Sequence, residues 1–113
     1  HLTEYVLKLF SRDYRLSFVT IPPLVQTLRS LKMVDYVEEI AEKILETIDL
    51  KIRDQKYLSY LCRLMKALGE SGCGDIVARI LKKVIYASNK LAEQDRVRIL
   101  SEIGKTFYGT SLL

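Results

Sequence analysis

The chain has 113 residues, of which 49% are hydrophobic and 28% charged, a composition typical of one globular domain and not of a disordered or collagen-like protein. Its 18 basic and 14 acidic residues leave a net charge of +4, which permits binding to polyanions without requiring it. No apolar run approaches the ~18 to 20 residues that a membrane-spanning helix requires, so we expect no membrane contact.

Apolar residues recur at intervals of three and four from the start of the chain, the spacing of one face of an α-helix. This pattern predicts a first helix over residues 1–16, with Thr3 as its N-cap. Pro22 and Pro23 have backbone angles suited to the first turn of a helix, so a second helix is expected over residues 20–32.

The later segments carry clearer start and stop signals. Asp35 and Glu38 have the spacing of a capping box, and Asp54 is a suitable N-cap for the helix that follows it. Gly69 lies where a left-handed residue ends a helix, before a turn at residues 71–74. No segment shows the period of two that is typical of a strand. The remaining helices are expected over residues 36–50, 54–68, 75–88 and 92–108.

A shift of 36 residues brings the apolar positions of two different helices into register. The aligned sets are Ile40 and Ile76, Ala41 and Val77, Ile44 and Ile80, Leu45 and Leu81, Ile48 and Val84, then Val25, Leu61 and Val97, Leu28, Leu64 and Leu100, and Leu31, Ala67 and Ile103. The predicted fold is therefore all-α, a tandem array of helix-turn-helix repeats that forms a fragment of an α-solenoid. An irregular helical bundle is the alternative.

This interpretation treats residues 1–113 as one α-helical repeat segment. Residues 1–16 are the second helix of a partial repeat, 20–50 and 54–88 are full hairpins, and 92–108 are the first helix of another partial repeat. Both ends then expose an apolar face, so we expect neighbouring repeats or protein subunits there. Since the chain begins without methionine, we expect it to be a segment of a longer protein.

One hairpin carries a recognisable pattern. Its first helix, Tyr57-Leu58-Ser59-Tyr60-Leu61-Cys62-Arg63-Leu64-Met65-Lys66-Ala67-Leu68-Gly69, has leucines on one face and closes on Ala-Leu-Gly. With the 36-residue period, this resembles the organellar RNA-binding helical repeats of the octotricopeptide and heptatricopeptide type, the latter found with RAP domains, and more distantly the pentatricopeptide repeats. The glycine is present in this copy alone, because Met33 and Lys105 stand at the equivalent positions.

The resemblance implies a non-catalytic module that binds RNA, either ribosomal RNA or an organellar transcript. It also implies a mitochondrial location, within a mitochondrial ribosome or an RNA-processing assembly. The alternative is an α-solenoid scaffold for protein–protein interaction with no nucleic-acid contact. A free-standing regulatory helical bundle is a third class.

The charge layout indicates where RNA would bind. The first helices of the hairpins carry a net charge of +5 and the second helices −1, and in stacked hairpins one helix set faces the ligand. Each neutralised phosphate adds affinity through counterion release. Tyr57 and Tyr60 are candidates for base stacking, against the alternative of burial between helices. The candidate RNA-binding residues, each otherwise part of a solvated helix face, are Gln26, Arg29, Lys32, Lys56, Arg63, Lys66, Arg96 and Arg98.

No group of residues in the sequence has the spacing of a catalytic, metal-binding or cofactor-binding site. A catalytic cysteine needs a base, commonly a histidine. The single histidine of the chain is His1, at its very start, so Cys62 and Cys73 lack a suitable base. We expect both to be free thiols in a reducing intracellular compartment. Glu38 and Glu42 share a helix face, as an acid and base pair requires, but an amphipathic helix has the same pattern on its solvated side. The chain is therefore predicted to be no enzyme.

Overall fold

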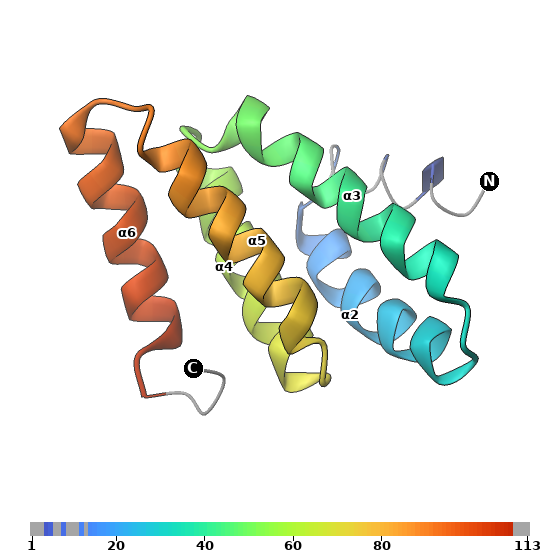
Figure 1. The fold of residues 1–113 in the computed structure, drawn as a ribbon. Helices are drawn as coiled ribbons and strands as arrows, with labels where there is room; N and C mark the ends of the chain where they lie inside the picture. Colours follow the sequence, from blue (N-terminus) through green and yellow to red (C-terminus); the bar gives the residue numbers. More distant parts are fainter. Residues whose placement is uncertain (1–3, 6–7, 9–11, 13, 110–113) are drawn as a thin grey trace.

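The computed structural model is all-helical over the part of the chain it describes, namely residues 4, 5, 8, 12 and 14–109, and no residue of that part lies in a strand. Its helices are α2 (Tyr14–Ser30), α3 (Val34–Lys51), α4 (Gln55–Glu70), α5 (Gly74–Ser88) and α6 (Glu93–Phe107) (Figure 1). This confirms the predicted all-α fold class. No helix within the described residues combines the length and hydrophobicity needed to cross a membrane.

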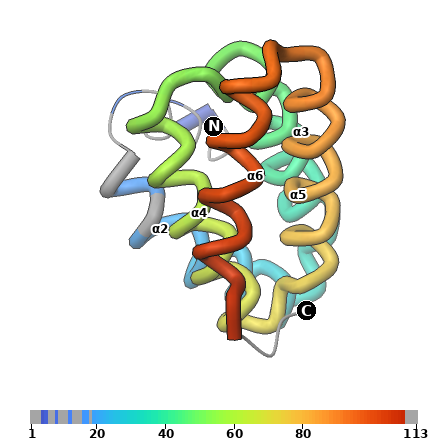
Figure 2. Tube along the Cα trace, turned by 90° about the vertical axis from the view of Figure 1, so that its left-hand side faces the viewer, coloured from blue at the N-terminus to red at the C-terminus, as the bar shows by residue number. Residues whose placement is uncertain are grey.

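The helices lie in two layers (Figure 2). One layer contains α2, α4 and α6, with α4 in the middle, and the other contains α3 and α5. Each connected pair, α2 with α3 and α4 with α5, is a helical hairpin. Two hairpins packed side by side and followed by a single helix are compatible with a helical-repeat array.

The core lies between the layers and is centred on α4, which packs against neighbours on several sides. Six side chains of α4 are at most 1% exposed, and each contributes about 1.5–3 kcal/mol by burial. They are Tyr57, Leu58, Leu61, Leu64, Met65 and Leu68. The apolar spacing that predicts this helix therefore corresponds to its buried face.

The structure differs from the expectation at the start of the chain. α2 runs without a break over Tyr14–Ser30, so the predicted boundary between residues 1–16 and 20–50 does not occur, and Pro22 and Pro23 lie inside the helix. Each proline lacks the amide hydrogen that would bond the carbonyl four residues earlier. Burial offsets this loss, because Ile21 and Val25 beside the prolines are each 1% exposed. Most of the predicted helix 1–16, with its Thr3 cap, lies outside the described residues.

The capping box predicted for the third helix is not formed. α3 begins at Val34, and its N-cap residue Met33 makes no side-chain capping bond. The preceding turn explains the early start: Met33 N donates to Leu28 O and Lys32 N donates to Arg29 O, both at 2.9 Å. This is the Schellman pattern, which ends α2 and leads directly into α3. Asp35 therefore lies within the first turn of α3.

The α4–α5 turn repeats this pattern. Cys73 N donates to Leu68 O at 2.9 Å and Gly72 N to Gly69 O at 3.1 Å. The left-handed residue is Gly72, with a φ of 82°, and not Gly69, which stays helical and buried. Lys32 and Gly72 take the same place in their turns and lie 40 residues apart. The 36-residue period stays unconfirmed.

Two predicted helix starts agree with the structure. Asp54 caps α4, since its Oδ1 accepts hydrogen bonds from Lys56 N at 2.9 Å and Tyr57 N at 3.3 Å. Ala92 is the residue directly before α6. An Asp side chain at the N-cap satisfies backbone donors that have no partner inside the helix, which is why this signal can be read from sequence.

Candidate nucleic-acid interface

The outer face of α4 carries a groove of about 460 Å³, called here the α4 groove. Its described lining residues are Gln55, Lys56, Ser59, Tyr60 and Arg63. Their spacing of one, three and four residues places them on one side of the helix. Two are cationic, one is aromatic and two are neutral hydrogen-bonding side chains, so no acidic residue of the described chain lines this groove.

Tyr60 and Arg63 interact within the α4 groove. The guanidinium carbon of Arg63 lies 5.6 Å from the centre of the Tyr60 ring, which is the distance of a cation–π contact. Tyr60 is half-buried and Arg63 is exposed. The pair thus presents an aromatic ring beside a positive charge. Proteins use this combination to bind a base and its phosphate in single-stranded nucleic acids.

Tyr57 has a different position from Tyr60. Its side chain is 0% exposed, and its hydroxyl oxygen lies 3.5 Å from Thr47 Oγ1 on α3. A ring enclosed in the core cannot stack on a base, so base stacking by Tyr57 is wrong and the alternative, burial between helices, holds. Of the two predicted stacking tyrosines, only Tyr60 is accessible.

Three predicted RNA-binding residues follow one another along α4. Lys56 and Arg63 line the α4 groove, and Lys66 lies almost one turn beyond Arg63. All three are exposed, and no ion pair within the described residues neutralises them. They form a positive stripe that passes the Tyr60 ring.

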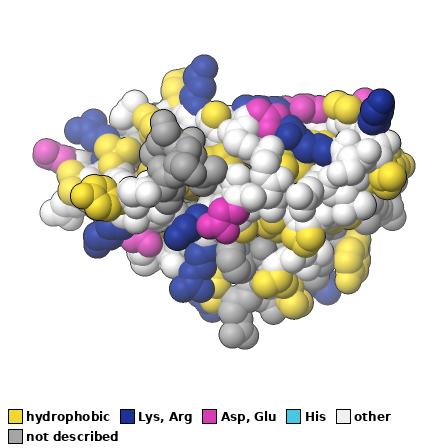
Figure 3. Space-filling view, turned by 90° about the horizontal axis from the view of Figure 1, so that it is seen from below, with side chains coloured by type: hydrophobic (Ala, Val, Ile, Leu, Met, Phe, Trp, Pro, Cys, Tyr) yellow, Lys and Arg dark blue, Asp and Glu magenta, His cyan; other side chains and the backbone are white. Residues whose placement is uncertain are grey.

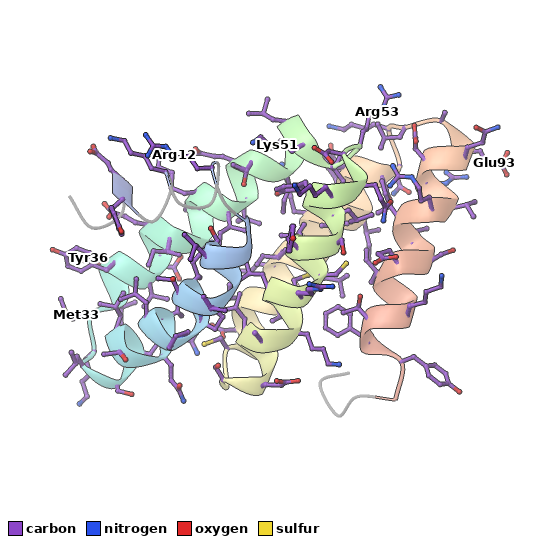
Figure 4. The ribbon with its side chains drawn as sticks, turned by 180° about the vertical axis from the view of Figure 1, so that it is seen from behind. Arg12, Met33, Tyr36, Lys51, Arg53 and Glu93 are labelled. Carbon is purple, nitrogen blue, oxygen red and sulfur yellow. The ribbon has the colours of Figure 1, made fainter. Side chains whose placement is uncertain are left out.

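Arg29 and Arg98 are engaged inside the molecule. Arg29 pairs with the Asp75 carboxylate and donates to Gly72 O at 3.4 Å, which joins the end of α2 to the α4–α5 turn. Arg98 donates to Gln55 Oε1 and, at 3.1 Å, to the carbonyl of Arg53, which joins α6 to the start of α4. Arg53, labelled in Figure 4, lies in the loop between α3 and α4. These two guanidinium groups therefore connect neighbouring helices.

The remaining candidates are dispersed. Gln26 is exposed on α2 and Arg96 is half-buried on α6. Lys32 lies in the α2–α3 turn beside a separate hollow of about 210 Å³ that also includes Met33 and Tyr36, labelled at one end of the molecule in Figure 4. The structure thus brings together the α4 residues but not all eight candidates.

Three acidic residues of α3 contact α5. Glu38 and Glu42 accept hydrogen bonds from the two Nη atoms of Arg79, at 2.9 and 2.7 Å, and Asp49 pairs with Lys83 at 2.9 Å. Sequence reasoning missed this role for Arg79, because the partners lie 37 and 41 residues away. Mixed charge is also visible on the face shown in Figure 3, where basic and acidic side chains lie next to each other.

The carboxylates and thiols of the described chain are not gathered into a metal-binding group. No cluster of three or more His, Cys, Asp or Glu residues in the part described is placed to hold a metal. Cys62 and Cys73 are buried free thiols. Burial raises the pKa of the Cys62 thiol to about 11, and it also raises the pKa of Cys73. Both thiols are therefore neutral and unreactive near pH 7.

Comparison of this chain with protein-family models, with curated proteins and with solved structures finds no match.

Proposed function

We propose that this chain is a non-catalytic RNA-binding module of the helical-repeat type. It would act within a larger organellar assembly, such as a mitochondrial ribosome or an RNA-processing complex. The observation that carries the proposal is the α4 groove, in which Lys56, Arg63 and the accessible ring of Tyr60 lie on one helix face. The organellar setting comes from the resemblance of the hairpin sequence alone.

Each side chain of the groove has a chemical role in this proposal. Lys56, Arg63 and Lys66 neutralise phosphates, and every phosphate contact releases counterions. A base that stacks on Tyr60 contributes about 1–3 kcal/mol and displaces little protein, because the ring is already accessible. Gln55 and Ser59 supply an amide and a hydroxyl for a base edge or a ribose hydroxyl.

Binding to phosphates on α4 leaves the intramolecular ion pairs intact. Lys56, Arg63 and Lys66 have no carboxylate to leave, whereas Arg29 would have to break its pair with Asp75. The contribution of Arg29 to RNA affinity is therefore expected to be smaller than that of Arg63. This order follows because Arg29 already has a carboxylate partner and Arg63 has none among the described residues.

The experiment compares the affinity of the chain for a polypyrimidine single strand and for a structured RNA at about 50 mM salt. The variant Arg63→Glu/Lys66→Glu reverses the α4 stripe and should abolish binding. The matched control, Lys82→Glu/Lys90→Glu, introduces the same charge change on α5 and two residues past its end, in the other layer, and should retain affinity. Equal loss in both variants, or no binding by the folded wild-type chain, would overturn the proposal.

A protein-interaction scaffold is the second candidate, and the exposed apolar residues favour it. Val97 and Leu100 on α6 are 56% and 41% exposed, and Leu31 and Val34 beside the α2–α3 turn are 64% and 59% exposed. Neighbouring repeats or protein subunits would cover such residues. Binding through them would persist at high salt, which separates this function from RNA binding.

A further inference from the structure

The second layer carries a groove of its own, between α3 and α5, of about 320 Å³. We call it the α5 groove. Its described lining residues are Leu45, Arg79, Lys82, Lys83 and Tyr86. One of them belongs to α3 and the other four to α5. The proposed RNA surface lies on α4, so the α5 groove is a separate site.

The floor of the α5 groove is apolar. Leu45 is half-buried and packs against the core. Tyr86 is 59% exposed, which leaves most of a large aromatic ring in contact with water. Aromatic residues of this kind provide much of the binding energy at protein interfaces when a partner covers them. The floor is therefore suited to receive one aliphatic or aromatic side chain.

Two ion-pair bridges join α3 and α5 beside the groove. Arg79 of α5 reaches Glu42 of α3 at 2.7 Å, and Lys83 reaches Asp49 at 2.9 Å. Leu45 lies between Glu42 and Asp49 along α3, about one helical turn from each. The apolar floor is consequently framed by two charged contacts that join the same two helices.

Two lysines beside the floor remain available to a partner. Lys82 is exposed and forms no ion pair among the described residues. Lys90 lies with its Nζ 4.5 Å from the centre of the Tyr86 ring, a contact with the ring and not with a carboxylate. A partner that covers Tyr86 therefore meets two positive charges that its own carboxylates can neutralise.

We propose that the α5 groove docks an acidic amphipathic segment of a partner protein. One apolar side chain of that segment enters between the two bridges and covers Leu45 and Tyr86. Its carboxylates, about one helical turn away, pair with Lys82 and Lys90. A basic segment would be repelled by these same lysines.

Nucleic acid fits this groove less well than a peptide. Glu38, Glu42 and Asp49 pair with residues that line it, and a phosphate backbone, which carries a charge at every nucleotide, cannot avoid these carboxylates. The apolar floor offers no partner for phosphate oxygens. A peptide concentrates its charge at a few positions and can therefore place carboxylates at Lys82 and Lys90 while an apolar side chain fills the floor.

The probe is a short synthetic peptide that forms an amphipathic helix. Leucine and phenylalanine recur three and four residues apart on one face, and glutamates occupy the positions between them. Backbone amide shifts of the isotope-labelled protein should change along α5 around Lys82 and Tyr86. Lys82→Glu/Lys90→Glu should weaken binding by about tenfold or more, since it replaces two attractive charge contacts by repulsive ones. Lys56→Glu/Lys66→Glu on α4 should leave the affinity for the peptide unchanged.

Further measurements decide the chemistry of the occupant. Tyr86→Ala, a change at a position that is 59% exposed, should weaken binding while leaving its salt dependence the same. A version of the peptide with lysines in place of glutamates should not bind. The proposal is overturned if α5 amides do not shift, if the lysine peptide binds equally well, or if polyuridine displaces the acidic peptide from the same amides.

Discussion

Lys32 occupies in the α2–α3 turn the position that Gly72 occupies in the α4–α5 turn. Both residues have a left-handed backbone, with φ of 61° and 82°, and both turns close with the same pair of backbone hydrogen bonds. Glycine adopts this conformation freely, whereas a lysine with its Cβ does so at a cost. The first hairpin therefore contains a local strain that the second lacks.

Lys32→Gly should stabilise the protein by about 1 kcal/mol, because it relieves the left-handed strain while keeping the turn. Gly72→Ala is the reciprocal change and should destabilise it by a similar amount. A Cβ at Gly72 has open space around it, so its cost is one of backbone conformation alone. Urea unfolding followed by circular dichroism measures both. A loss of stability in Lys32→Gly would contradict this account of the turn.

The bridges between α3 and α5 should make a measurable contribution to stability. Arg79→Ala removes contacts to both Glu38 and Glu42 and should lower the free energy of unfolding by about 1 kcal/mol, less at high salt. Lys82→Ala on the same helix has no ion pair to lose and serves as the control. If the two variants are equally stable at low salt, the bridges do not hold the second layer together.

Stability should fall in alkaline solution because of Cys62. Its thiol has an ordinary pKa of 9.0 and a pKa of about 11 in the fold, chiefly because burial disfavours the thiolate. Above pH 9 the unfolded chain ionises while the folded chain keeps its proton. The free energy of unfolding is therefore unaffected by this group below pH 9 and falls between pH 9 and 11, by at most about 1.4 kcal/mol per unit of pH.

The control for this pH dependence is Cys62→Ala, which removes the titrating group. The variant should lose less stability than the wild type between pH 9 and 11, so the difference between the two curves isolates the thiol. Identical curves would mean that Cys62 ionises as readily in the folded chain as in the unfolded one.

The two tyrosines of α4 should respond in opposite ways to truncation. Tyr57→Ala empties a position that is 0% exposed and should destabilise the fold by about 3–5 kcal/mol, as for a buried phenylalanine. Tyr60→Ala should change stability little and lower the affinity for single-stranded RNA by about 1–3 kcal/mol, the value of one stacked base. Thermal unfolding and fluorescence anisotropy test the pair. An unaltered RNA affinity in Tyr60→Ala would contradict base stacking on Tyr60 in the α4 groove.

Sequence patterns predicted the helices where burial and local signals agree. The apolar face of α4 and its Asp54 cap depend on residues within a few positions of each other, so periodicity and capping chemistry suffice. The continuity of α2 across residues 16–20 could not be predicted in this way. Pro22 and Pro23 signal a helix start locally, but burial of Ile21 and Val25 against the rest of the chain stabilises a longer helix.

The candidate site was predictable only in part, for the same reason. Lys56, Arg63 and Lys66 share one helix, and their spacing alone places them on one face. The contacts of Arg29 with Asp75 and of Arg98 with Gln55 join residues 46 and 43 positions apart. Such partners are set by how helices pack and not by local spacing, so their internal roles emerged from the structure.

The most direct test of RNA binding is a salt titration of the affinity for a polypyrimidine single strand. The account predicts a linear fall of log K with log salt concentration, and a slope that Arg63→Glu/Lys66→Glu reduces by about one or two, the number of phosphate contacts removed. Affinity that is independent of salt, or a slope that is unchanged in the double variant, would contradict phosphate binding by α4.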